Sequence, residues 1–302
     1  MFGASNYNYE HFSRDLLREF MDGKVSGPQA GDYAPDFTAD SLDGEPVRLR
    51  DLRDRNVLLI FGSATCPMTA ATMGELNALA EELKDDVAFL FVYVREAHPG
   101  DRLPAHESEA NKIDAARLLR EEEAIAMPVL VDDLRGTVHR KYSVLPHSAF
   151  LIDKSGRIAF RSLWSNPDAL AAAIDDLLAL QDAEGSDHAV VRDGEDPSMP
   201  LSYAMLRSHR ALHRGGRQAV KDFYTAVGRD SGSLRRNKSL LTNPARVFSI
   251  AALTAAVLAG GIYAGFELRR RRLGIRRNPY RAYEKEKVRD TETGEDYGAV
   301  GI

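Results

Sequence analysis

The sequence predicts an α/β domain over residues 31–181, because short apolar runs that suit buried strands alternate with segments of helical periodicity. The clearest strand is VLLIF at 57–61, a continuous apolar run of the kind found in buried central strands. The segment 68–83 follows it with a helical spacing of apolar residues, namely Met73, Leu76, Leu79 and Leu83. This strand and helix form the centre of the predicted domain.

The other predicted elements complete the fold class. The stretch 31–51 has an Asp-Gly turn between β-prone runs and predicts an N-terminal β-hairpin. Further along the chain we expect a strand at 87–94, a helix at 113–125, a strand at 127–131, a hairpin of strands 148–152 and 157–160, and a helix at 167–180. This order of strands and helices is typical of a thioredoxin-like fold.

The chain on either side of this domain divides by composition and charge. We expect a helical extension at 1–30, a polar linker at 182–200, a basic helical region at 201–246, a transmembrane helix at 247–266 and a charged tail at 267–302. Residues 1–200 carry a net charge of −16, whereas residues 201–246 carry +8. An acidic main domain is a poor fit to a nucleic-acid partner, so none is predicted.

The segment 247–266 reads VFSIAALTAAVLAGGIYAGF and has no charged residue. Twenty helical residues span about 30 Å, which matches the hydrocarbon core of a bilayer. The sequence therefore predicts a single-pass membrane protein, the alternative being a buried helix of a soluble domain. Gly261 and Gly265 form a small-xxx-small pair that could bring two such helices together in a homodimer.

The side of the membrane that the main domain faces stays open. Basic residues within fifteen positions of the segment number four before it and seven after it, which favours a cytoplasmic tail. Yet the N-terminus has no signal peptide that would export 246 preceding residues. The basic region 201–246 also suits anionic lipid headgroups as partners, and these are usually met on the cytoplasmic face.

Cys66 is the one cysteine of the chain, which excludes an internal disulfide, a CxxC pair and a multi-cysteine metal cluster. No metal site and no bound cofactor are predicted. Cys66 directly follows a predicted strand and begins a predicted helix, where backbone N–H groups and the helix dipole favour a thiolate. The alternative is a buried, inert cysteine. A reactive Cys66 would need an external thiol as reductant, because no second cysteine can resolve its oxidised form.

Three motifs carry a family resemblance: FGSATCP at 61–67, REAHPG at 95–100 and PAHESEANKIDAARLL at 104–119. In this order they resemble the iodothyronine deiodinases and their bacterial relatives, within the wider thioredoxin and peroxiredoxin superfamily. The resemblance covers about residues 30–181. It implies that Cys66 stands at the position of the catalytic selenocysteine, and that Glu96 and His98 are catalytic partners.

The same resemblance suggests how a substrate is held. His106 matches a second family histidine, and Ser63 and Thr65 flank the cysteine in the first motif. Pro146 occupies the position of the proline that thioredoxin-like folds place beside the active cysteine. We therefore expect these four residues to line the substrate site.

Two departures from the family pattern concern the reductant and the substrate. Ala64 replaces the family's auxiliary cysteine, and Trp164 stands near a family arginine that holds the substrate's carboxylate end. The leading hypothesis is a membrane-anchored thiol oxidoreductase that removes a halogen from an aromatic small molecule. A histidine near neutral pH is the natural proton donor for that reaction, and Glu96 could orient or charge His98 if both leave a strand on one face.

Two alternatives remain open. The first is a single-cysteine peroxiredoxin-like enzyme with a peroxide substrate, although Ser63 stands where that family has a threonine and no activating arginine is identifiable. The second is a non-enzymatic adaptor with a redoxin fold at a membrane.

Overall fold

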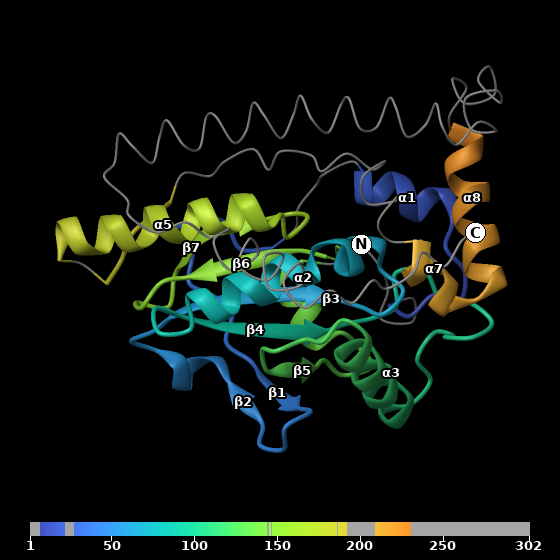
Figure 1. Ribbon diagram of the computed structural model, residues 1–302, viewed down its shortest axis with the longest axis horizontal. Helices are drawn as coiled ribbons and strands as arrows, with labels where there is room; N and C mark the ends of the chain where they lie inside the picture. Colours follow the sequence, from blue (N-terminus) through green and yellow to red (C-terminus); the bar gives the residue numbers. More distant parts are fainter. Residues whose placement is uncertain are drawn as a thin grey trace, which may run out of the picture. The chain divides into compact units, whose positions relative to one another are not determined.

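A seven-stranded mixed sheet forms the centre of the protein, with the strand order β2-β1-β5-β4-β3-β6-β7 (Figure 1). The computed structural model describes residues 7–21, 27–143, 145, 147–185, 187–191 and 209–230. The strands are β1 (Thr38–Ser41), β2 (Val47–Arg48), β3 (Asn56–Gly62), β4 (Val87–Tyr93), β5 (Val129–Val131), β6 (Ala149–Ile152) and β7 (Ile158–Ser162).

Strand pairing gives the sheet its thioredoxin-like core. β3 runs parallel to β4, and β4 runs parallel to β5, whereas β6 is antiparallel to both β3 and β7. β1 and β2 form the predicted antiparallel hairpin, and β1 joins it to the sheet edge at β5. The parallel register pairs Gly62 with Tyr93, so the chain leaves β3 and β4 at the same edge of the sheet.

Helices cover both faces of this sheet. They are α1 (Arg14–Met21), α2 (Pro67–Glu82), α3 (Glu109–Glu122), α4 (Thr137–Tyr142), α5 (Pro167–Glu184), α7 (His209–Gly215) and α8 (Arg217–Asp230), with a 3₁₀ turn at Leu49–Leu52. Leu58 and Ile60 of β3 face a core shared with α2, α3 and α5. Val57, Leu59 and Phe61 face a second core with α4. Cover on both faces explains the continuous apolar run of β3.

The structure adds one helix that the pattern did not predict and extends another. α4 follows β5 as a six-residue helix (TVHRKY), which is too short to show a clear helical period. α5 continues to Glu184, inside the segment expected to be a linker. Ala189 and Val191 of that segment are buried, and the Val191 N–H donates to the Ala159 carbonyl at 3.0 Å.

The described part of the basic region, residues 209–230, packs on the main domain. Leu201–Ala226 reads as one amphipathic helix, but within the described residues two helices, α7 and α8, meet at Gly216, whose φ is +96°. A residue with that backbone angle interrupts a helix, and glycine adopts it without strain. α7 packs against α2, and α8 packs against α1. Figure 1 shows α1, α7 and α8 together near one end of the sheet.

The predicted membrane segment, 247–266, lies outside the described residues. Among the residues that are described, no helix is both long enough and apolar enough to cross a bilayer.

Candidate active site

Cys66 lies where the sequence places it, at the junction of β3 and α2. It is the N-cap residue of α2, with extended backbone angles, and Pro67 follows at the first helical position. Proline suits that position because its missing N–H would have had no partner in the helix. The side chain is almost fully buried, with 2 % of its surface exposed. In this state the thiol is enclosed within the protein.

Two opposing effects act on the Cys66 thiol. Burial raises its pKa above the ordinary value, and the nearby Glu96 carboxylate adds to that rise. The first turn of α2, through the backbone N–H groups of Met68 and Thr69 and the Thr69 hydroxyl, acts in the opposite direction and lowers the pKa. The helix N-terminus therefore acts as expected, but burial outweighs it, and the net pKa is raised.

The loop after β4 is fastened to the loop after β3, because the two parallel strands end side by side. The Ser63 hydroxyl accepts the Ala97 N–H at 3.1 Å, and the Thr65 hydroxyl accepts the His98 N–H at 3.0 Å. Both hydroxyl side chains are fully buried. Ser63 and Thr65 thus hold the segment that carries Glu96 and His98 in place.

Glu96 is the centre of a buried polar network. One carboxylate oxygen accepts hydrogen bonds from the Thr65 N–H, at 2.8 Å, and from the Thr65 hydroxyl. The other accepts one from Tyr93 and lies 3.3 Å from Nε2 of His106. Burial alone would raise the pKa of Glu96, but His106, Thr65 and Tyr93 outweigh it and hold the pKa below the ordinary value. The carboxylate is therefore ionised and paired with His106.

The predicted partnership of Glu96 with His98 is not formed, and this expectation was wrong. It assumed that residues 96 and 98 leave an extended strand on one face. β4 ends at Tyr93, and the chain bends at Arg95 and Ala97, so the two side chains diverge. Glu96 turns to Tyr93 and Thr65, whereas Nδ1 of His98 is buried without a hydrogen-bond partner among the described residues.

His98 lies between aromatic rings that come from both ends of the described chain. Its ring centroid is 4.2 Å from that of Phe12 and 5.2 Å from that of Phe223 on α8. Burial lowers its pKa to about 3, partly offset by Glu96. The Tyr9 hydroxyl donates to the Ala97 carbonyl at 2.8 Å, which fixes the N-terminal segment on the same loop. His98 is therefore neutral and covered in this state.

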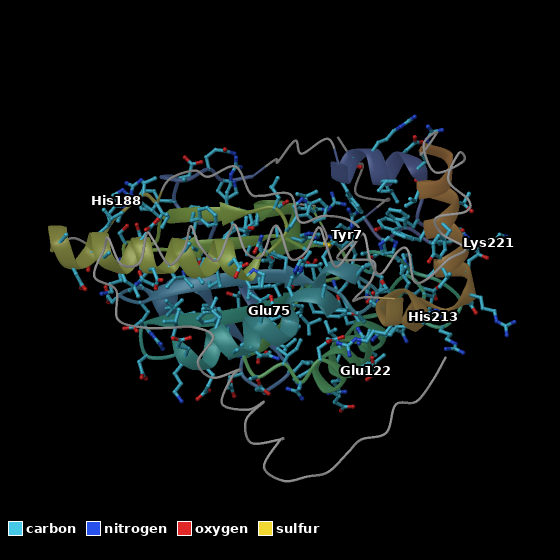
Figure 2. All side chains as sticks on the ribbon, turned by 45° about the horizontal axis from the view of Figure 1, so that its top comes forward. Tyr7, Glu75, Glu122, His188, His213 and Lys221 are labelled. Carbon is cyan, nitrogen blue, oxygen red and sulfur yellow. The ribbon has the colours of Figure 1, made fainter. Side chains whose placement is uncertain are left out.

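α7 closes the site next to α3. Arg214 forms ion pairs with Glu122 and Glu123 and donates to the Ala64 carbonyl at 3.0 Å. Figure 2 labels Glu122 of α3 and His213 of α7 on these two neighbouring helices. A Cβ on Gly215 would lie 2.6 Å from the His98 carbonyl oxygen, so only glycine lets α7 approach this closely. The helix thereby touches both loops that carry the site.

Apolar side chains form the immediate surroundings of the thiol. Met68 and Ala97 pack with Cys66 in one buried cluster, and Trp164 packs against it. Trp164, one of the two departures from the family pattern, thus lies beside the cysteine. Pro146 lies outside the described residues.

Sequence reasoning brought together Ser63, Thr65, Cys66, Glu96, His98 and His106, and the structure has all six in or around this buried network. It missed Tyr93, Phe12, Phe223 and Arg214. Tyr93 could have been predicted, because it is the last residue of β4, which ends beside the end of β3 and therefore beside the Cys66 loop. The others come from distant segments that carry no local signal.

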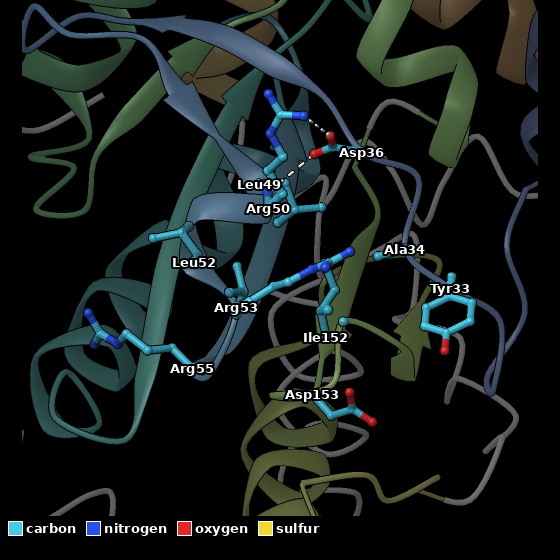
Figure 3. A pocket seen from close by; sticks show the side chains of 12 residues that line it. Tyr33, Ala34, Asp36, Leu49, Arg50, Leu52, Arg53, Arg55, Ile152 and Asp153 are labelled. Carbon is cyan, nitrogen blue, oxygen red and sulfur yellow. Dashed lines mark hydrogen bonds and ion pairs between the residues drawn. The ribbon is translucent and has the colours of Figure 1, made fainter.

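A separate cavity lies at the opposite end of β3. It has a volume of about 120 Å³ and is lined by Tyr33, Arg50, Arg53, Arg55 and Asp153, among others (Figure 3). Arg50 approaches Asp36 at 4.0 Å, and the Arg157 guanidinium stacks over Tyr33 at 3.8 Å. This cavity shares no residue with the Cys66 site.

A cysteine that caps the first helix after a central strand, on this sheet topology, defines a thioredoxin-like protein of the thiol oxidoreductase class. Residues 14–168, just over half of the chain, match the family model for iodothyronine deiodinase. The chain belongs to the iodothyronine deiodinase family.

Curated relatives agree with this assignment. A type I iodothyronine deiodinase from Xenopus laevis is 30% identical over 169 residues, which cover 53% of this chain and 66% of the relative. A thyroxine 5-deiodinase from Gallus gallus is 30% identical over 136 residues, covering 41% and 52%. The chain therefore spans between half and two thirds of these relatives' lengths.

Among solved structures, an uncharacterized conserved protein from Geobacillus kaustophilus is similar, with a TM-score of 0.45 and 20% sequence identity. The similarity covers 57% of this chain and 89% of that one. It is too distant to bear on function.

Proposed function

We propose that the protein is a thiol-dependent reductase that removes a halogen from an aromatic small molecule, with Cys66 as the nucleophile. The observation that carries this proposal is the buried set formed by Cys66, the Glu96–His106 pair and His98 on two adjacent loops. Trp164 and Met68 beside the sulfur add apolar surface suited to an aromatic ring.

The proposed reaction balances in three steps. The Cys66 sulfur takes the halogen from the ring as a sulfenyl halide, while the ring carbon gains a proton. An external thiol then attacks the sulfur, releases halide and a proton, and leaves a mixed disulfide at Cys66. A second external thiol frees Cys66 and carries away the disulfide. The external thiol is required because Cys66 is the one cysteine of the chain.

The contacts favour His106 as the source of the proton. Its Nε2 lies 3.3 Å from the Glu96 carboxylate, and a histidine beside a carboxylate is a common general acid in enzymes. His98 is held neutral by burial, with its pKa lowered to about 3. Its free Nδ1 is instead available to hydrogen-bond a substrate group that replaces the covering aromatic rings.

A substrate must displace part of the cover to reach Cys66. Phe12 and Phe223 lie on His98, and Arg214 holds α7 on the Ala64 carbonyl. In our proposal the apolar segment 247–266 anchors the chain in a membrane, and α8 leads toward it in sequence. A membrane position would suit a lipophilic aromatic substrate.

The test is halide release from an iodinated tyrosine-like aromatic, with dithiothreitol as reductant and hydrogen peroxide as a competing substrate. We expect Cys66→Ser to abolish halide release, and Arg53→Ala at the opposite end of the sheet to leave it unchanged. Peroxide reduction without halide release would favour the peroxidase alternative. Equal halide release by Cys66→Ser would overturn the proposal.

The membrane anchor has its own test. Deletion of residues 247–302 should move the protein from the membrane fraction to the soluble fraction. A truncated protein that still sediments with membranes would show that this segment is not the anchor.

A further inference from the structure

The sulfur of Cys66 is enclosed by segments from several parts of the chain, although the proposed reaction requires an external thiol to reach it. The side chain is 2 % exposed and packs with Met68, Ala97 and Trp164. Figure 1 shows α1, α7 and α8 near the end of the sheet toward which β4 points, which is the end that holds the cysteine. The size of the thiol that can reach the sulfur therefore depends on how this cover is attached.

Backbone atoms fasten the turn between α7 and α8 to the site. The Arg102 N–H donates to the Gly215 carbonyl at 3.0 Å, and a Cβ on Gly100 would lie 2.5 Å from the same carbonyl oxygen. A Cβ on Gly215 would lie 3.3 Å from Cγ2 of Thr65, the residue before Cys66. Because backbone is packed against backbone here, no side-chain rotation can widen this contact.

A buried ion pair holds the same helix in place. The Arg214 guanidinium donates to the Ala64 carbonyl at 3.0 Å and pairs with Glu123 of the α3 C-cap. Only 6 % of the Arg214 side chain and 3 % of the Glu123 side chain are exposed. Lifting α7 would separate these charges, and breaking a buried ion pair is strongly destabilising. α7 is therefore a firmly attached part of the cover.

The other part of the cover consists of side chains. The rings of Phe12 and Phe223 lie on His98, with centroid distances of 4.2 Å and 5.2 Å, and both belong to one apolar cluster. Side-chain rotamers change readily on ligand binding while the backbone moves little. A movement of these rings opens room for a small molecule and leaves α7 where it is.

The geometry of a disulfide separates small thiols from protein thiols. Two cysteines joined by a disulfide have an S–S bond of about 2 Å and Cα atoms about 4.4–6.8 Å apart. A protein thiol would thus have to bring its own backbone within about 7 Å of the Cα of Cys66. Met68, Ala97 and Trp164 fill the space around the sulfur, and α7 contacts the loop just before it. A small thiol carries its sulfur on a short carbon chain and has no further backbone to place.

We propose that the reductant of Cys66 is a low-molecular-weight thiol, and that α7 excludes the thiols of other proteins from the sulfur. This deepens the proposed function and rests on it only in that Cys66 passes through an oxidised form. One small thiol bonds to the Cys66 sulfur and displaces halide, with loss of its proton. A second attacks the sulfur of the first, so that a disulfide of two small thiols leaves and Cys66 regains its electron pair and a proton.

The test follows attack on the Cys66 sulfur and uses no halogenated substrate. DTNB, an aromatic disulfide, forms a mixed disulfide with Cys66, the one cysteine of the full chain. Its nitrothiophenolate is the better leaving group, so the absorbance of the released nitrothiophenolate reports attack on the Cys66 sulfur. Dithiothreitol and reduced thioredoxin are compared as a small dithiol and a protein dithiol. The rate of each is divided by its rate with free DTNB, which has no cover.

We expect release by thioredoxin to be slowed about a hundredfold more than release by dithiothreitol, because only the protein requires α7 to open. Glu123→Ala, which weakens the α7 contact, should narrow this difference severalfold. Glu81→Ala removes an exposed ion pair with Lys84 and should leave it unchanged. Equal slowing of the two dithiols would overturn the proposal, as would failure of DTNB to label the folded chain. Halide release is measured separately, so failure of the proposed dehalogenation and failure of this inference give different results.

Discussion

The two ends of the central sheet hold their charged side chains in opposite ways. At the carboxyl ends of β3 and β4, Glu96 is buried and each of its oxygens has fixed partners. At the amino end of β3, Arg50 and Asp36 are more than half exposed and approach only to 4.0 Å. A buried charge depends on every one of its partners, whereas an exposed pair is screened by water. Side-chain contacts at the carboxyl ends of β3 and β4 should therefore affect reactivity far more than contacts at the amino end of β3.

Glu96→Ala should give the largest effect on stability. It leaves the Thr65 N–H, the Tyr93 hydroxyl and His106 without their acceptor in a buried site, which should lower the free energy of unfolding by about 3 kcal/mol. Asp36→Ala, at the exposed end, should lower it by less than about 1 kcal/mol. Urea denaturation measures the free energy of unfolding of both variants. Losses of equal size would contradict the difference between the two ends of the sheet.

Glu123→Ala should loosen the cover over the cysteine. Glu123 is buried and pairs with Arg214 and Arg210, so its loss leaves Arg214 short of a partner and weakens the contact of α7 with α3. We expect the free energy of unfolding to fall by about 2 kcal/mol and the alkylation of Cys66 to become severalfold faster. Glu81→Ala removes an exposed ion pair with Lys84 and serves as the control. Unchanged alkylation of Cys66 would show that α7 does not limit access.

The stability of the domain should fall as the pH falls below about 6.5. His98 and His147 are buried in the neutral form, with pKa values lowered to about 3 and about 4. Below pH 6.5 these histidines bind protons in the unfolded chain but remain neutral in the folded chain. Each histidine should then remove about 1.4 kcal/mol of unfolding free energy per pH unit.

His98→Leu should reduce that slope between pH 6.5 and 5, because one of the buried histidines with a lowered pKa no longer titrates on unfolding. Chemical denaturation at several pH values measures it. A stability that stays level across this range in the wild type would mean that the buried site opens and admits water.

Arg53→Ala should have the smallest effect. Arg53 lines the cavity at the amino end and is exposed, so we expect its loss to change the free energy of unfolding by less than about 0.5 kcal/mol. Halide release should also be unchanged. A loss of activity in this variant would mean that the two ends of the sheet are coupled.

Local pattern predicted the central part of the fold and the position of the cysteine. The run 57–61 and the period of 68–83 became β3 and α2, with Cys66 between them, because burial on both faces leaves a readable apolar signal. α4 was missed because a helix of six residues is too short to show a clear period. The break at Gly216 was missed because the apolar spacing continues across it.

The contacts of the site were harder to predict than its residues. Glu96 and His98 were expected to pair on spacing alone, but the bends after Tyr93 separate them and bring Glu96 to His106. The buried contacts of His147 with Phe61, Thr69 and Thr72 were also missed, because these residues are distant in sequence. Such contacts depend on how strands and helices pack, which the spacing of residues along the chain does not reveal.

The most direct test of the central claim is a single-turnover reaction followed by mass spectrometry of Cys66. Reduced protein is mixed with an iodinated aromatic and then with one equivalent of a small thiol. We predict one iodide released per Cys66 and a mixed disulfide between Cys66 and that thiol. Release of iodide while Cys66 remains a free, alkylatable thiol would contradict the account.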